Sequence, residues 1–187
     1  ERVAEEAEGE PLTEEEVRQL DRYGEAPPAD RDGMFELMLD RISDIEHDLD
    51  ADFSERELLA SITEEAVMQR TLARRLKDCA NHAYKVDREA EVVNAKKTDI
   101  RLRPMRSDQQ AVIELKLANN GYSVRHLLDA LEVQLVGQYL KHDDCKAGCL
   151  LVTMAKSRGW EHPDTGAKIA LSDVVALLNA RAEEIAA

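Results

Sequence analysis

The stretch that decides the fold is Thr98-Asp99-Ile100-Arg101-Leu102-Arg103, followed after a short turn by Ala111-Val112-Ile113-Glu114-Leu115-Lys116. Strand side chains alternate between the two faces of a sheet, so Glu114 and Lys116 are expected to share one face. If the two runs pair as a hairpin, the carboxylates of Asp99 and Glu114 meet the Lys116 ammonium on that face. Such a surface suits a divalent cation and a water molecule, which makes phosphodiester hydrolysis the leading hypothesis.

The same pattern also occurs on ordinary sheet surfaces, where one exposed Glu and one exposed Lys interrupt an apolar strand. The sequence on both sides favours the functional interpretation. Downstream, residues 123–140 are expected to form a helix with Ser123 as its N-cap.

This helix carries a stripe that changes from apolar to polar. Leu127, Leu131, Gln134 and Gln138 follow one another at helical spacing. A glutamine amide gains nothing from an apolar contact, so Gln134 and Gln138 are predicted to border a polar site. The alternative is a half-buried helix with two solvated glutamines.

Two acidic residues upstream are accessory candidates. Residues 61–79 are expected to form a helix, in which Glu65 lies on the same face as Gln69 and Leu72. An acidic residue in a first helical turn also favours the helix dipole, which is the structural alternative for Glu65. Glu91, or Glu89 as its alternative, in an expected strand over residues 84–93, is the second candidate.

The spacing of Asp99, Glu114 and Lys116, with fourteen residues between the two acids, resembles the PD-(D/E)XK or restriction-endonuclease-like nuclease superfamily. The resemblance covers roughly residues 64–187, and Thr98 stands where a proline is usual. It implies that Asp99, Glu114 and the backbone carbonyl of Leu115 bind Mg²⁺, for which Mn²⁺ would substitute. Lys116 would then orient or deprotonate the attacking water, or neutralise charge in the transition state.

The segment from Gln134 to Leu140 is similar to the glutamine-tyrosine helix motif of several nuclease subfamilies. This resemblance implies a catalytic role for Gln134 and places Gln138 and Tyr139 at the border of the active site.

The expected order of elements is helix, three strands, helix and strand, the order of the common core of the nuclease superfamily. This order predicts an α/β fold with a mixed central sheet flanked by helices. The expected ranges are helix 61–79, strands 84–93, 98–104 and 111–118, helix 123–141, strand 147–154 and a final helix 172–186.

Charge divides the chain into an acidic and a nearly neutral part. Residues 1–65 hold 23 acidic and 6 basic residues, whereas residues 69–116 hold 7 acidic and 12 basic residues. The local basic excess is compatible with a nucleic-acid backbone, and DNA is preferred over RNA as the partner. The expected phosphate contacts are Arg101, Arg103, Lys156 and Arg158.

The predicted organisation is an acidic linker over residues 1–31, a helical arm over 32–56 and a nuclease-like domain over 57–187. The chain begins with Glu1, so we expect a fragment of a longer protein. The phrases DGMFELMLDRISDIEHDL and KKTDIRL resemble C-terminal nuclease-like domains of large prokaryotic proteins, defence systems among them. That resemblance implies upstream domains as partners, and double-strand cutting would call for a homodimer or higher assembly.

No window is long and apolar enough for a membrane span, and no signal peptide begins the chain. The three cysteines are expected to be free thiols, so a prokaryotic cytoplasm is the predicted location. The alternative to a nuclease is a catalytically inactive nuclease fold that serves as a protein-interaction or oligomerisation module.

Overall fold

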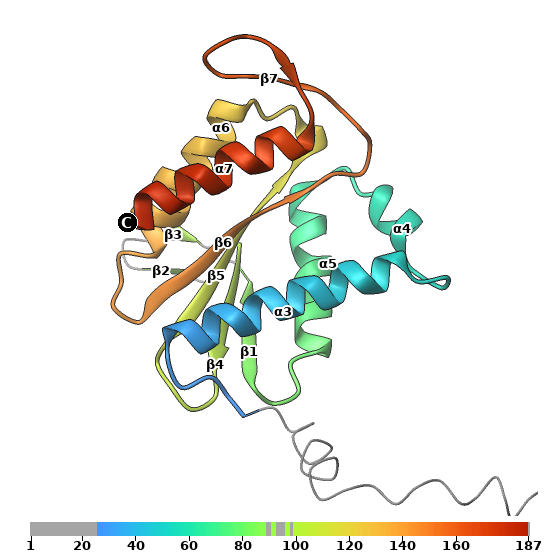
Figure 1. Ribbon diagram of the computed structural model, residues 1–187. Coiled ribbons are helices and arrows are strands. Elements are labelled where there is room, and N and C mark those ends of the chain that lie inside the picture. The colour runs from blue at the N-terminus through green and yellow to red at the C-terminus, as the bar shows by residue number, and fades with distance from the viewer. Residues whose placement is uncertain (1–25, 89–90, 93–95, 98, 187) are drawn as a thin grey trace, which may run out of the picture.

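The computed structural model describes residues 26–88, 91–92, 96–97 and 99–186 (Figure 1). Most of the predicted acidic linker, Glu89 and Thr98 lie outside these described residues. In the part of the chain that is described, every helix is too short or too polar to cross a membrane.

A four-stranded mixed sheet forms the centre of the fold, in the order β1-β4-β5-β6. β1 and β4 are antiparallel, β4 and β5 are antiparallel, and β5 and β6 are parallel. The mixed sheet predicted from the sequence is therefore confirmed. The strands span Tyr84–Arg88, Ile100–Pro104, Gln110–Leu117 and Cys145–Thr153.

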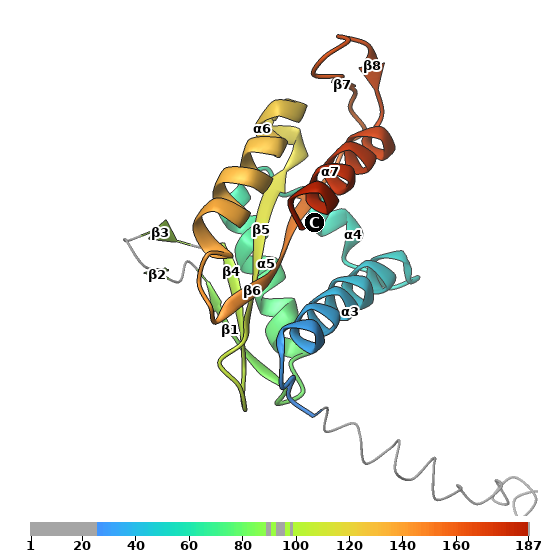
Figure 2. The same cartoon turned by 60° about the vertical axis from the view of Figure 1, so that its left-hand side comes forward.

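Helices cover both faces of the sheet, and Figure 2 shows α3 and α6 on opposite sides of the strands. On one face lie α3 (Arg31–Asp50) and α5 (Glu65–Asp78), preceded by the short α4 (Arg56–Ala60). The predicted helical arm thus packs on the sheet through α3. The hydrophobic core on this face joins these helices to the odd-numbered side chains of β5. It includes Met34, Met38, Leu72 and Leu76 from the helices and Ile113, Leu115 and Leu117 from β5.

The other face is covered by α6 (Val124–Asp129), a π-helical continuation η2 (Ala130–Tyr139) and α7 (Leu171–Ala186). Ser123 caps α6 as predicted, since its hydroxyl accepts the His126 N–H. The second core holds side chains from these helices and from the even-numbered side of β5, including Val112, Leu127, Leu131, Leu135, Val174 and Leu178.

The structure corrects several expected boundaries. The first strand ends at Arg88, and the short strands β2 (Glu91–Val92) and β3 (Lys96–Lys97) form a separate hairpin. The first core helix begins at Glu65 rather than at residue 61, because Ser61 closes α4: its hydroxyl donates to the Leu58 carbonyl at 2.6 Å. A hairpin of β7 (Trp160–Glu161) and β8 (Lys168–Ile169), and the 3₁₀ turn η1 (Ala118–Asn120), were not predicted.

Residues 123–141 were expected to be a single α-helix, but from Ala130 onward the turns widen to π geometry. Gly137 permits this wide turn, because a Cβ added there would lie 2.9 Å from the carbonyl oxygen of Glu132, five residues earlier. Runs of π-helix are rare in proteins overall, and those that occur are often found at functional sites. The widening sets which side chains of η2 face the sheet.

Candidate active site

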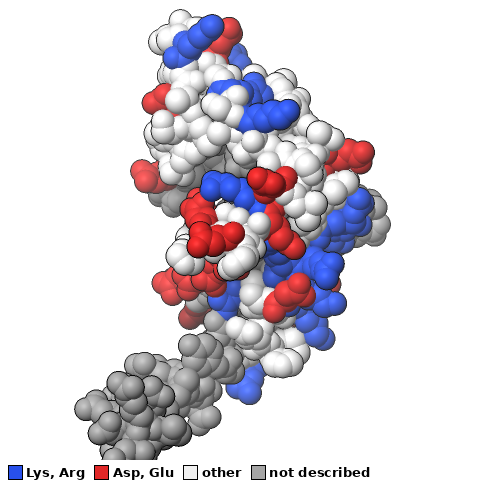
Figure 3. Space-filling view, turned by 90° about the vertical axis from the view of Figure 1, so that its right-hand side faces the viewer, with Lys and Arg blue, Asp and Glu red and all other residues white. Residues whose placement is uncertain are grey.

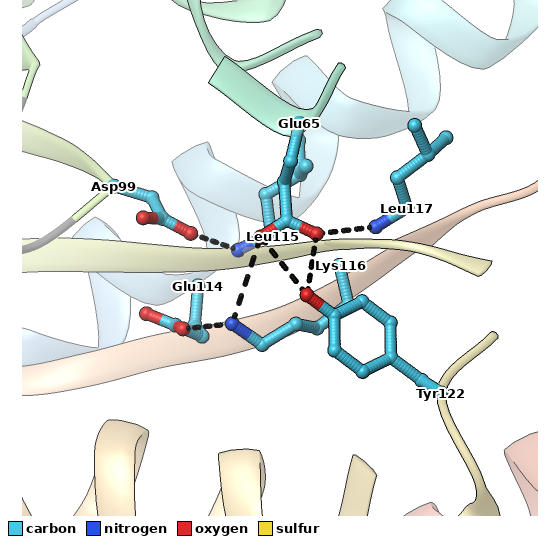
Figure 4. A network of polar contacts seen from close by, with 7 residues as sticks. All are labelled: Glu65, Asp99, Glu114, Leu115, Lys116, Leu117 and Tyr122. Atoms are coloured by element: carbon cyan, nitrogen blue, oxygen red, sulfur yellow. Dashed lines mark hydrogen bonds and ion pairs between the residues drawn. The ribbon is translucent and has the colours of Figure 1, made fainter. Parts of the chain in front are cut away.

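The register of the β4–β5 hairpin brings the predicted acidic pair together. Ile100 pairs with Ile113, so Asp99 lies beside Glu114 on the face opposite α3 and α5. Figure 4 shows the Glu114 carboxylate at the Lys116 ammonium and the Asp99 carboxylate at the backbone N–H of Leu115, between them.

Glu114 and Lys116 form a buried ion pair beneath η2. Nζ of Lys116 lies 2.7 Å from Oε1 of Glu114, and the two side chains are 11% and 3% exposed. Leaving two charges in a low-dielectric interior is costly unless each has good partners. Burying this ion pair therefore costs folding free energy that apolar side chains at the same positions would not cost.

Asp99 is held by the backbone of β5, since its Oδ2 accepts the Leu115 N–H at 2.8 Å. Asp99 lies just before β4, where the ladder of that strand has not yet begun. The N–H and C=O of one strand residue point toward the same neighbour, so the Leu115 carbonyl also faces the side of Asp99. This direction suits the carbonyl ligand that was predicted at Leu115.

Glu65 reaches the site from the first turn of α5, as expected for the accessory acid. Its Oε2 accepts the Leu117 N–H at 2.9 Å and the Tyr122 hydroxyl at 3.1 Å. Its Oε1 lies 3.9 Å from Nζ of Lys116. Glu65 therefore ties helix α5 to the end of β5 and adds a third carboxylate around the lysine (Figure 4).

The electrostatics of the pair follow from burial and from this crowding of carboxylates. Burial, and then the charge of Asp99, raise the pKa of Glu114 to about 7, although Lys116 opposes the shift. Burial alone would lower the pKa of Lys116, but its hydrogen bond to Glu114 and the charges of the surrounding carboxylates raise it. Lys116 is thus an ammonium in a site of net negative charge.

Two buried oxygen atoms at this site have no hydrogen-bond partner among the described residues: Oε2 of Glu114 and Oε1 of Gln134. An unsatisfied buried acceptor costs about 1–3 kcal/mol, and more when it is charged. Tyr139 also contributes a hydrogen bond to the Glu114 carboxylate, so a cation bound there would add to the partners that this group already has.

The predicted residues of η2 lie on two sides of the site. Gln134 and Gln138 line a polar cleft of about 710 Å³ that also contains Lys116. Tyr139 is buried and lies close to the acidic pair: burial, and then the charges of Glu114 and Asp99, raise the pKa of its phenol. A second hollow of about 350 Å³, between α3, α4, α5 and β6, is lined mainly by apolar side chains and contains none of these groups.

Three of the four predicted phosphate contacts already have partners within the protein. Arg101 and Arg103 both pair with Asp87 of β1, at 3.5 Å for Arg101. Arg158 donates to the Ala118 carbonyl and its guanidinium lies 4.7 Å from the centre of the Trp160 ring. These three cations therefore have structural partners.

The remaining two predictions have different outcomes. Lys156 is exposed, on the loop that follows β6, and its side chain is open to solvent. Glu91 lies in β2, but its side chain falls outside what the structure describes, so its accessory role stays a prediction.

Sequence reasoning missed Tyr122. Besides donating to Glu65, the Tyr122 ring lies 5.8 Å from Nζ of Lys116, within reach of a cation–π interaction. Nε1 of the buried Trp160 donates to the Tyr122 carbonyl at 3.0 Å and fixes this segment. The only signal in the sequence was the position of Tyr122, directly after Gly121, whose φ of +87° ends the turn that follows β5.

The donor set fits a hard divalent cation. Among the described residues, no three His, Cys, Asp or Glu side chains are arranged as a complete metal centre. Mg²⁺ does not require one, because it commonly binds through one or two carboxylates, waters and substrate phosphate. Asp99, Glu114 and the Leu115 carbonyl offer hard oxygen donors of that kind.

Comparison with known proteins assigns the chain to a family. No curated protein and no solved structure was found to match it. The family described as Domain of unknown function (DUF8371) matches residues 34–157, a range that contains Asp99, Glu114 and Lys116. Since this range is more than half of the chain, the protein belongs to the DUF8371 family.

Proposed function

We propose that this protein is a Mg²⁺-dependent nuclease with a restriction-endonuclease-like core, and that it hydrolyses phosphodiester bonds, preferably in DNA. The observation that carries the proposal is the meeting of the Asp99 and Glu114 carboxylates with the buried Lys116 ammonium on one face of the sheet. Several carboxylates crowded against one lysine leave negative charge that a divalent cation would neutralise.

Asp99, Glu114 and the Leu115 carbonyl would hold Mg²⁺, or Mn²⁺ in its place. When bound, the metal supplies a water of lowered pKa and positive charge at the phosphate. Lys116 lies among carboxylates, which keep it an ammonium. It therefore neutralises charge building on the phosphate and orients the attacking water.

The surrounding residues support this chemistry. Glu65 holds the end of β5 and restrains the Lys116 ammonium from the side of α5. Gln134, on the opposite wall, offers an amide to water or to a phosphate oxygen. Tyr139 keeps the floor of the site dry beside Glu114. A dry site strengthens each of these electrostatic interactions.

The proposal also includes the cellular setting of the protein. The domain acts in a prokaryotic cytoplasm as the effector of a larger, defence-type protein, whose upstream domains control it. Cutting of both strands of a duplex would require two such sites, supplied by a homodimer or a higher assembly. Close proximity of the sites in an assembly raises their effective concentration on one substrate.

The test is a cleavage assay on supercoiled plasmid, linear duplex, single-stranded DNA and RNA, with Mg²⁺, Mn²⁺ or EDTA. Asp99→Asn, Glu114→Gln and Lys116→Met should each lower the rate by about a hundredfold or more. Asp108→Asn is the matched control, because this exposed carboxylate lies on the same hairpin at the other end of β5.

A second candidate function is an inactive interaction module. It is favoured by Phe35 and Leu39, which lie one turn apart on α3 and are both exposed to solvent. Wild type that is inert on all four substrates and binds no metal would support this candidate and contradict the nuclease.

A further inference from the structure

The polar cleft next to Lys116 has a lining that the cleavage chemistry does not require. It lies between the turn that follows β5 and the helices α6 and η2, and its residues include Asn120, Tyr122, His126, Gln134 and Gln138. Its volume of about 710 Å³ falls in the range of small-molecule sites. Neither Asp99 nor Glu114 lines it, so it extends from the lysine away from the carboxylates.

The lining is close to neutral and rich in amides. Three carboxamides line the cleft from two sides. The cleft also contains one lysine, Lys116, and one acid, Asp129, whose charges have opposite sign. Each carboxamide has both an acceptor oxygen and two donor N–H groups. A cleft built to hold phosphate throughout would carry several cations, whereas this one has a single lysine at one end.

Neutral planar heterocycles with donors and acceptors along their edges match this lining. We infer that the cleft is a nucleobase pocket, which holds one unstacked base of the substrate while its phosphate lies at Lys116. This inference rests on the proposed nuclease function. Amides recognise base edges, and the Tyr122 ring offers a surface on which a base stacks.

The wall that carries Tyr122 is rigid enough to act as such a platform. The phenol is fixed by Glu65, and the backbone carbonyl of Tyr122 is fixed by Trp160. The opposite side of the molecule offers less to a nucleic acid. On the face that carries α4, Arg56 and Arg75 are each paired with an acid, Asp50 and Glu55, at 2.7 Å, and acidic and basic side chains lie close together (Figure 3).

A pocket for an unstacked base has a consequence for the substrate class. A base leaves a duplex only at the cost of pairing and stacking, whereas a single strand presents it freely. The protein therefore prefers single-stranded nucleic acid, or the opened part of a duplex, over an intact double helix.

The test measures binding without cleavage. The Asp99→Ala variant, whose change lies outside the cleft, is titrated in Mg²⁺ with a labelled single-stranded DNA octamer and with an octamer of abasic sugar-phosphates of the same charge. Fluorescence anisotropy should show that the octamer with bases binds about tenfold more tightly. Adding Gln138→Ala should lower this ratio toward one, and Asn120→Ala, on the other wall, should act in the same direction.

Gln109→Ala is the matched control, because the Gln109 amide donates to the Asp143 carbonyl away from the cleft. It should leave the ratio unchanged. Equal affinity for the two octamers, no binding of either, or a ratio that neither cleft variant changes would overturn the pocket. The cleavage assay of wild type is independent of this result. Cleavage with no preference for bases would support the nuclease and contradict the pocket. A preference for bases without cleavage would support the pocket and contradict the nuclease.

Discussion

Glu114 and Lys116, two residues apart on β5, form a 2.7 Å ion pair with both side chains buried. The pair lies where the sheet meets η2, and one oxygen of Glu114 has no hydrogen-bond partner among the described residues. An ion pair of this kind contributes little stability of its own, but removing one partner leaves an uncompensated buried charge.

Lys116→Met should therefore destabilise the protein by about 3 kcal/mol at pH 8 in the absence of divalent metal, because Glu114 must then either stay buried as a lone carboxylate or take up a proton. The double variant Glu114→Gln/Lys116→Met should recover most of this loss, since neither charge remains. Urea unfolding of the two variants and wild type measures the difference. Equal destabilisation in the single and double variants would contradict the uncompensated charge.

Tyr122→Phe should lower the cleavage rate by about tenfold with little change in stability, because Glu65 loses the donor that orients it toward Lys116. The effect should fall on kcat more than on KM. Tyr84→Phe is the matched control: this variant removes a buried hydroxyl that donates to the Leu76 carbonyl, far from the site. Tyr84→Phe should lose stability and keep its kcat, and an equal loss of kcat in both variants would argue against a positioning role for Tyr122.

Gly148→Ala should destabilise the protein by about 2 kcal/mol. A Cβ at this position of β6 would lie 2.9 Å from the Leu135 side chain of η2 and 3.0 Å from the Val112 carbonyl, which is fixed in the sheet. Gly159→Ala is the control, because the nearest described atom to its new Cβ would be the Ile169 carbonyl oxygen, at a comfortable 3.9 Å. Thermal unfolding should separate the two variants, and similar midpoints would show that η2 is not packed tightly on β6.

Cys145 gives a dependence of stability on pH. Burial, and then the charge of Asp144, raise the pKa of the Cys145 thiol to about 11. Since the folded pKa lies above the unfolded one, the stabilisation is complete below about pH 8.5 and is lost as pH rises toward 11. Between pH 8 and 10, wild type should lose about 1 kcal/mol more of its free energy of unfolding than Cys145→Ala does. Parallel pH profiles of the two proteins would contradict the burial of this thiol.

The sequence was a good guide where the fold depends on local alternation. The placement of Asp99, Glu114 and Lys116 on one face needed only a period of two and one hairpin. These features follow from short-range pattern, so they could be expected before the structure was known.

Features that depend on distant neighbours were not predictable in this way. Arg101 and Arg103 looked available for phosphate, but Asp87 of the neighbouring strand pairs with both. The four-residue spacing of Gln134 and Gln138 suits an α-helix and a π-helix alike, so the sequence could not reveal η2. The support of Tyr122 by Trp160 joins residues that are 38 positions apart.

The most direct measurement is metal-dependent cleavage of single-stranded and plasmid DNA by wild type and Lys116→Met side by side, with Mg²⁺ binding followed by calorimetry. Lys116→Met keeps both carboxylates, so the account predicts that both proteins bind Mg²⁺ and that only wild type cuts. Cleavage that persists in Lys116→Met, or a wild type that neither binds Mg²⁺ nor cuts any substrate, would contradict the assignment of this site.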